Sequence, residues 1–213
     1  MIRLVIADDH PIVRDGLKYL LAAAGDIEVV GEARNAQETI ERVRALRFDL
    51  LLMDMSMPGK SGIELIHQVH AEKPRLRVLV LSMHEEHQYA VRAIRAGASG
   101  YLTKESATLQ LVEAIRKVAA GGAFISAEVA QQLALGAMPD ATGPLHASLS
   151  DREFQILMLI TSGKSISDIA QQLFLSVKTV STHKSNILHK MRMTTQAELI
   201  RYALTHHLTD PSA

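Results

Sequence analysis

The sequence predicts an α/β domain with a five-stranded, doubly wound parallel sheet, followed by a second, all-α domain of four helices. Across residues 1–120, five short β-rich segments alternate with longer amphipathic segments, which is the pattern of βα units. Three of the short segments are dense in Leu, Val and Ile, as strands covered on both faces require. After residue 150 the β-rich segments stop, and helical periodicity alone continues.

The strands and helices of the first domain follow from this alternation. Strands are expected at residues 2–7, 28–33, 50–53, 77–81 and 100–102. Helices are expected at residues 11–24, 36–46, 62–72, 88–96 and 106–120. Pro11 suits a first helical turn, and Gly121 with Gly122 ends the last helix.

The second domain follows a linker. Residues 127–135 favour a short helix, and residues 136–147 are rich in Gly, Pro and small side chains. Helices are then expected at residues 151–161, 165–173, 177–191 and 195–207. Ser150 with Glu153, and Ser165 with Asp168, are spaced as capping boxes. The expected division is therefore a first domain at 1–120, a linker at 121–147 and a helical domain at 148–213.

The composition narrows the class of protein. The chain has 213 residues, 47% of them hydrophobic and 22% charged, which is ordinary globular usage. It has no cysteine, so disulfides and thiolate metal sites are excluded. No apolar run approaches the roughly 18 residues of a membrane span. We therefore expect a cytoplasmic protein with no membrane partner.

Polar side chains stand at the ends of four predicted strands. Asp8 and Asp9 follow the first strand, Asp54 the third, Ser82 the fourth and Lys104 the fifth. Because ligands of open parallel sheets bind beyond the carboxyl ends of the strands, these groups should share one crevice. Three carboxylates in one place repel one another unless a divalent cation neutralises them, and hard oxygen ligands favour Mg²⁺.

Residues 1–120 resemble the receiver domains of bacterial two-component response regulators, which have a flavodoxin-like fold. The resemblance lies in Asp8-Asp9-His10, Met53-Asp54-Met55-Ser56-Met57-Pro58-Gly59, Leu81-Ser82 and Gly100-Tyr101-Leu102-Thr103-Lys104. It implies that Asp54 accepts a phosphoryl group from a sensor histidine kinase. It also implies an Mg²⁺ site formed by Asp8, Asp9, Asp54 and the backbone carbonyl of Ser56.

The same resemblance assigns roles to five more side chains. Lys104 pairs with the bound phosphoryl group, and the Ser82 hydroxyl hydrogen-bonds it. Tyr101 turns inward behind Ser82 and reshapes the neighbouring surface. Ser56 and His84 stand where the family tunes the lifetime of the phosphoryl group.

The second domain contains a helix-turn-helix pattern. Apolar residues at 166, 169, 170, 173, 175, 180 and 187 have the spacing of two helices joined by a tight turn. Residues 176–192 carry Lys178, Lys184, Lys190 and Arg192 without one acidic residue. Residues 148–208 resemble the NarL/FixJ (LuxR-type) response regulators in this segment, in residues 149–153 and in residues 197–200.

This resemblance implies double-stranded DNA as a partner. The candidate DNA-binding residues are Lys178, Thr179, Val180, Ser181, Thr182, His183, Lys184 and Ser185. Lys178, Thr179 and Lys184 would contact phosphates, and Ser181, Thr182 and Ser185 would face base edges. In the family the last helix pairs two such domains, which points to Ala197, Ile200 and Arg201 as dimerisation residues.

Both halves together predict a phosphorylation-controlled, DNA-binding transcription regulator, which is not an enzyme although its receiver assists its own phosphorylation and dephosphorylation. A homodimer is expected when the chain is phosphorylated or bound to DNA, and RNA polymerase is a further candidate partner. One alternative is a DNA-binding regulator whose atypical receiver acts without phosphorylation. A second is an aspartyl-phosphate hydrolase, although its nucleophile would follow the first strand, with a second Asp where His10 stands. A third is a helical protein-binding module with a basic face.

Overall fold

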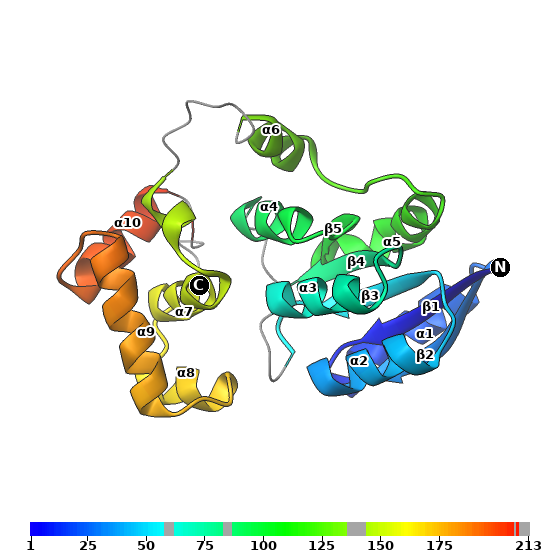
Figure 1. The fold of residues 1–213 in the computed structure, drawn as a ribbon. Helices are drawn as coiled ribbons and strands as arrows, with labels where there is room; N and C mark the ends of the chain where they lie inside the picture. Colours follow the sequence, from blue (N-terminus) through cyan, green and yellow to red (C-terminus); the bar gives the residue numbers. More distant parts are fainter. Residues whose placement is uncertain (58–61, 83–86, 136–143, 207, 209–213) are drawn as a thin grey trace. The chain divides into compact units, whose positions relative to one another are not determined.

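The computed structural model describes residues 1–57, 62–82, 87–135, 144–206 and 208 (Figure 1). The chain forms two compact units, residues 1–131 and 132–213. Among the described residues, no helix is both long enough and apolar enough to cross a membrane.

The first unit is built on a five-stranded parallel sheet in the order β2-β1-β3-β4-β5 (Figure 1). The strands are β1 (Ile2–Ala7), β2 (Ile27–Ala33), β3 (Leu50–Asp54), β4 (Arg77–Ser82) and β5 (Gly100–Thr103). Because all five run in the same direction, their carboxyl ends lie at one edge of the sheet. The predicted doubly wound parallel sheet is confirmed.

Helices cover both faces of this sheet. They are α1 (Pro11–Ala22), α2 (Ala36–Ala45), α3 (Gly62–Glu72), α4 (His87–Arg95) and α5 (Lys104–Ala119). Alternate strand residues such as Leu4, Ile6 and Leu52 pack with α1 and α5 in one buried cluster. On the other face α2 packs against α3, and α3 against α4. A sixth helix, α6 (Ala127–Leu135), follows at the position predicted for a short helix.

The second unit is helical. A short 3₁₀ helix, η1 (Leu145–Ser148), precedes α7 (Asp151–Thr161), α8 (Ile166–Gln172), α9 (Val177–Lys190) and α10 (Gln196–Thr205). Its core includes Phe154, Ile169 and Leu199, each 0% exposed. The four predicted helices are confirmed, and both predicted capping boxes are present.

Several element ends differ from the prediction by one or two residues, and at three helix starts the reason is a side-chain cap. Ser165 and Thr195 are caps and not first helical residues. Likewise α5 begins at Lys104 and not at residue 106, because the Thr103 hydroxyl oxygen accepts a hydrogen bond from the backbone N–H of Ser106. Lys104 is thus fixed directly after β5, at the edge of the sheet.

Candidate functional site

An acidic pocket lies at the carboxyl edge of the sheet. Asp8 follows β1, and Asp54 is the last residue of β3. Both are nearly inaccessible, at 1% and 2% exposure, whereas the side chain of Asp9 is 27% exposed. Burying two carboxylates is costly unless cationic groups or hydrogen bonds compensate their charge.

Lys104 supplies part of that compensation. Its Nζ donates a hydrogen bond to Oδ2 of Asp8 at 2.7 Å and lies 3.1 Å from Oδ2 of Asp54. The backbone N–H of Ser56 donates to the other Asp54 oxygen, Oδ1, at 3.3 Å. One ammonium group therefore faces two buried carboxylates, and the net charge of this trio is negative.

The pKa directions reflect this balance. Burial raises the pKa of Asp54, and the charge of Asp8 raises it further, against the lowering effect of Lys104. Burial alone would lower the pKa of Lys104, but the charge of Asp54 and the hydrogen bond to Asp8 outweigh burial and raise it. Lys104 thus stays cationic, while Asp54 pays a free-energy cost for being ionised that a further cation would relieve.

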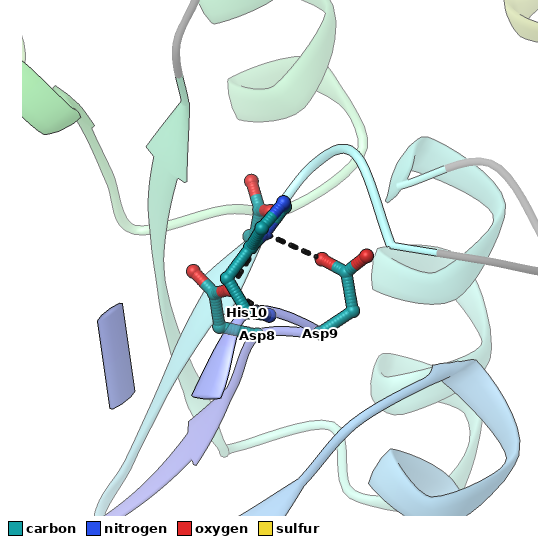
Figure 2. Close-up of side chains that lie close together, drawn as sticks. Asp8, Asp9 and His10 are labelled. Atoms are coloured by element: carbon teal, nitrogen blue, oxygen red, sulfur yellow. Dashed lines mark hydrogen bonds and ion pairs between the residues drawn. The ribbon is translucent and has the colours of Figure 1, made fainter. Parts of the chain in front are cut away.

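The carboxylates have the geometry of a cation site. Asp8, Asp9, His10 and Asp54 each offer one ligand atom, and these atoms lie within 4.8 Å of one another. Figure 2 shows the Asp8, Asp9 and His10 side chains gathered at the end of β1. The Nδ1 of His10 lies 3.0 Å from Oδ1 of Asp9 and 3.3 Å from Oδ1 of Asp8.

Two oxygen atoms in this group remain available to a cation. Oδ1 of Asp9 and Oδ2 of Asp54 are buried and accept no hydrogen bond from the described residues. Each has a nitrogen nearby as an ion-pair contact: His10 Nδ1 lies 3.0 Å from the Asp9 oxygen, and Lys104 Nζ lies 3.1 Å from the Asp54 oxygen. Carboxylate oxygens of this kind fit Mg²⁺, which prefers hard oxygen ligands and few protein contacts.

Arg14 holds the backbone at the end of β1, a role that the sequence pattern did not indicate. This buried residue of α1 donates from Nη1 to the backbone carbonyl of Asp8 at 2.7 Å. Its Nε donates to Oε2 of Glu32 on β2 at 3.0 Å, and Lys18 binds the other Glu32 oxygen at 2.8 Å. The backbone that carries Asp8 and Asp9 is therefore held by a buried guanidinium group. The sequence indicates His10 only as part of a motif, because its contacts with the Asp8 and Asp9 carboxylates depend on a side-chain rotamer.

The other predicted receiver residues lie on β4, on β5 and after β3, or fall outside the described residues. Ser82 is the last residue of β4 and is 0% exposed, and Tyr101 on β5 is 8% exposed. Ser56 follows Asp54 by two residues. His84, Pro58 and Gly59 lie outside the described residues. The roles of Ser82, Tyr101 and the Ser56 carbonyl stay predictions.

The helix-turn-helix is formed by α8 and α9. Ile169 of α8 and Val180 and Ile187 of α9 are each 0% exposed, so one face of each helix is in the core. The chain turns between the helices at Phe174, which has a left-handed backbone with φ of 54°. Ser176 caps α9 by accepting a hydrogen bond from the backbone N–H of Thr179 at 3.0 Å.

The outer face of α9 carries most of the predicted DNA-binding residues. Lys178, Ser181, Thr182 and Ser185 are exposed, and Thr179, His183 and Lys184 are partly buried. Nζ of Lys184 donates to the side-chain oxygen of Gln196 at 2.7 Å. The prediction that Val180 contacts DNA is wrong, because Val180 is completely buried and packs in the core beneath α9.

The predicted dimerisation residues lie on α10. Ala197 and Arg201 are exposed, and Ile200 is half-buried. Their roles stay predictions, because they depend on a second chain.

Comparisons with known proteins match both units. A family model described as the response regulator receiver domain matches residues 4–116. A second model, described as bacterial regulatory proteins of the luxR family, matches residues 147–203. The two matches together cover most of the chain.

Relatives match over the whole length. The chain is 37% identical to the response regulator UvrY of Escherichia coli O6:H1 over 209 residues, covering 98% of this chain and 96% of UvrY. It is 37% identical to the response regulator GacA of Pseudomonas viridiflava over 214 residues, covering all of both chains.

A similar solved structure is the response regulator RcsB of Salmonella typhimurium, with a TM-score of 0.71, 28% identity and coverage of 96% of this chain and 97% of RcsB. RcsB has also been solved in a complex with DNA and as two dimers bound to two parallel DNAs, each with a TM-score of 0.59.

Proposed function

The chain belongs to the two-component response regulators of the NarL/FixJ type, which join a receiver to a LuxR-type DNA-binding domain, and from that premise we propose that a phosphoryl group on Asp54 controls how α9 is presented to DNA. The family consists of transcription regulators and not of classical enzymes. The observation that carries the proposal is the contact of the partly buried Lys104 with the buried carboxylates of Asp54 and Asp8 at the carboxyl edge of the sheet.

The chemistry we propose is transfer from a phosphohistidine of a sensor kinase. An Asp54 carboxylate oxygen attacks phosphorus, the phosphorus–nitrogen bond breaks, and the histidine imidazole leaves and takes up a proton. Lys104, which lies 3.1 Å from Asp54, would pair with the added phosphoryl oxygens. The Ser82 hydroxyl would donate to the same group, and a shift of Tyr101, which is already only 8% exposed, would carry the change to the surface.

Receivers bind Mg²⁺ at an acidic pocket, and the donor atoms of this chain fit that ion. We propose Asp9, Asp54 and the Ser56 backbone carbonyl as its ligands, with Asp8 assisting. Bound there, Mg²⁺ supplies positive charge that offsets the negative charge of the transferring phosphoryl oxygens. The chain would in this way assist its own phosphorylation and dephosphorylation.

For DNA, we propose that Lys178, Thr179 and Lys184 contact phosphates while Ser181, Thr182 and Ser185 face base edges, with His183 beside them. Lys184 would leave its bond to Gln196 to do so. We propose a homodimer formed through Ala197, Ile200 and Arg201, and the two RcsB dimers bound to two parallel DNAs support dimerisation on DNA. We propose that the receiver spans residues 1–120, the linker 121–147 and the DNA-binding domain 148–213. We also propose that the protein acts in the cytoplasm, with RNA polymerase as a further partner.

Labelling with a small acyl phosphate tests the proposal. The full chain is incubated with Mg²⁺ and acetyl phosphate, and its intact mass should increase by one phosphoryl group. Asp54→Asn should abolish the increase, whereas Asp26→Asn, at an exposed ion pair with Arg116, should leave it unchanged. Equal labelling of the Asp54→Asn chain would refute the assignment.

The same samples separate the alternatives. Selection of duplexes from a random pool, with and without acetyl phosphate, should give phosphorylation-dependent enrichment. Enrichment that does not depend on acetyl phosphate would instead favour a receiver that acts without phosphorylation, and repeated turnover of a phosphate ester would favour a hydrolase.

A further inference from the structure

Five exposed residues share the outer face of α9: Lys178, Ser181, Thr182, Ser185 and Asn186. Their spacings of three and four residues place them along one stripe of the helix. This stripe is opposite the buried Val180 and Ile187. If α9 enters a major groove, as proposed above, this is the face that meets the base edges.

Two hydroxyl groups in this stripe are already donors within the helix. The Thr182 hydroxyl donates to the backbone carbonyl of Lys178 at 3.0 Å. The Ser185 hydroxyl donates to the backbone carbonyl of Ser181 at 3.1 Å. A hydroxyl has a single hydrogen, so each of these oxygens can only accept a further hydrogen bond.

An oxygen that only accepts discriminates among base edges. In the major groove, adenine presents the N6 amino group and cytosine presents the N4 amino group, and both are donors. Guanine presents two acceptors, O6 and N7, which would face the lone pairs of the hydroxyl oxygens without a hydrogen between them. Reading guanine would require each hydroxyl to give up its bond inside the helix.

Asn186 adds a group suited to the same bases. It is exposed and stands four residues after Thr182, so it lies one turn further along the stripe. An asparagine amide offers one acceptor and two donors, which match the N6 amino group and N7 of adenine.

We propose that α9 selects its DNA site through the amino groups of adenine and cytosine, with Thr182 and Ser185 as hydrogen-bond acceptors. This inference rests on the proposed DNA-binding function and adds the chemistry of the bases that are read. Lys178 contributes affinity through phosphates, and the two hydroxyl oxygens contribute discrimination.

Base analogues test this with the full chain and a duplex selected from a random pool. At each contacted position, adenine is replaced by purine, which lacks the N6 amino group, or cytosine by 2-pyrimidinone, which lacks the N4 amino group. Removal of a read amino group should weaken binding by about threefold to tenfold. Replacement of guanine by 7-deazaguanine should leave affinity unchanged. Loss of affinity with 7-deazaguanine alone would overturn the proposal.

Protein variants show which residue reads each amino group. An analogue that weakens DNA binding by the wild type should not weaken binding by the variant that lacks the acceptor for the removed amino group, whether this is Thr182→Val or Ser185→Ala. Ser162→Ala is a matched control, since its hydroxyl also donates to a helix carbonyl, that of Leu159 at 3.0 Å, but outside α9. This control should respond to the analogues as the wild type does. If both α9 variants keep the full analogue effect, the acceptor assignment is wrong.

Binding to random duplexes separates this inference from the function on which it rests. Affinity for such duplexes that falls with salt, together with an unchanged analogue effect in both variants, would overturn the inference and leave DNA binding intact. Absence of salt-dependent binding to any duplex would overturn both.

Discussion

Lys104 donates a hydrogen bond to Asp8 at 2.7 Å. Lys104 is the first residue of α5 and Asp8 follows β1, so two residues 96 positions apart form one ion pair at the edge of the sheet. The same ammonium group lies 3.1 Å from Asp54. Lys104 therefore occupies the electrostatic position that a divalent cation would also favour, and the two should compete for the carboxylates.

Lys104→Met should make the receiver depend on Mg²⁺. Without metal, two buried carboxylates lose their cation, and the free energy of unfolding should fall by about 3 kcal/mol. Added Mg²⁺ should then raise the midpoint of thermal unfolding more in this variant than in the wild type, because no ammonium group opposes binding. Calorimetry with and without MgCl₂ measures both effects. Arg44→Met, which breaks an exposed pair with Glu72, is the control, and an equal response to Mg²⁺ in all three chains would contradict the competition.

Lys178→Ala should weaken binding to duplexes of every sequence. Lys178 is exposed in the first turn of α9, and a lysine at a DNA phosphate releases counterions on binding. The slope of log affinity against log salt concentration should become shallower by about 0.9. Titration of a fluorescent duplex at several salt concentrations measures the slope. Lys117→Ala, on the exposed face of α5, should not change it, and an unaltered slope for Lys178→Ala would remove Lys178 from the interface.

The sequence predicted those parts of the fold that repeat a local pattern. The strands are runs of branched apolar residues, and the convergence of Asp8, Asp54 and Lys104 follows from parallel strands that end at one edge. The start of α5 was misplaced because Thr103 serves both as the end of β5 and as a helix cap, and a pattern of hydrophobicity does not separate these roles.

The contacts that set the geometry of the site lay beyond such patterns. Arg14 reaches the backbone carbonyl of Asp8 from six residues further along the chain, and it also binds Glu32 on a neighbouring strand, β2. These contacts depend on rotamers and packing, which no spacing in the chain encodes. Val180 was assigned to DNA by its place in the segment, although its apolar spacing with Ile187 already indicated the core.

Glu153 should give the DNA-binding unit an acid-sensitive stability. Its side chain, 5% exposed, accepts hydrogen bonds from Lys190 at 2.7 Å and from the backbone N–H of Ser150 at 2.8 Å. Burial acts to raise the pKa of Glu153, but Lys190 and Ser150 outweigh it, and the pKa is lowered. The stabilisation should be complete above the unfolded value of about 4.3 and should disappear as pH falls through the folded pKa.

Glu153→Gln measures that contribution. Near neutral pH the variant should be less stable than the wild type by about 1–2 kcal/mol, since it loses the ion pair and weakens the capping box. The difference should shrink below about pH 4. Urea unfolding across this pH range gives both values, with Glu28→Gln, exposed at the edge of the sheet, as the control. A difference that is independent of pH would mean that packing, and not charge, makes Glu153 important.

Phe174 should be replaceable by glycine with a gain in stability. The end of α8 is a Schellman motif, in which the N–H of Leu175 donates to the carbonyl of Ala170 at 2.9 Å and Phe174 adopts φ of 54°. The equivalent position after α7 is Gly163, with φ of 84°. A left-handed backbone costs a residue with a side chain about 1–2 kcal/mol, and the Phe174 ring is 71% exposed, so little burial offsets this cost.

Phe174→Gly should therefore raise the free energy of unfolding by about 0.5–1 kcal/mol, after the greater freedom of glycine in the unfolded chain is subtracted. Arg192, with φ of 55° at the matching position after α9, provides a comparison, and Arg192→Gly should change stability in the same direction. Thermal unfolding of the three chains measures both changes. A gain for Arg192→Gly together with a loss for Phe174→Gly would show that the exposed ring makes a stabilising contact, because backbone strain acts equally at both positions.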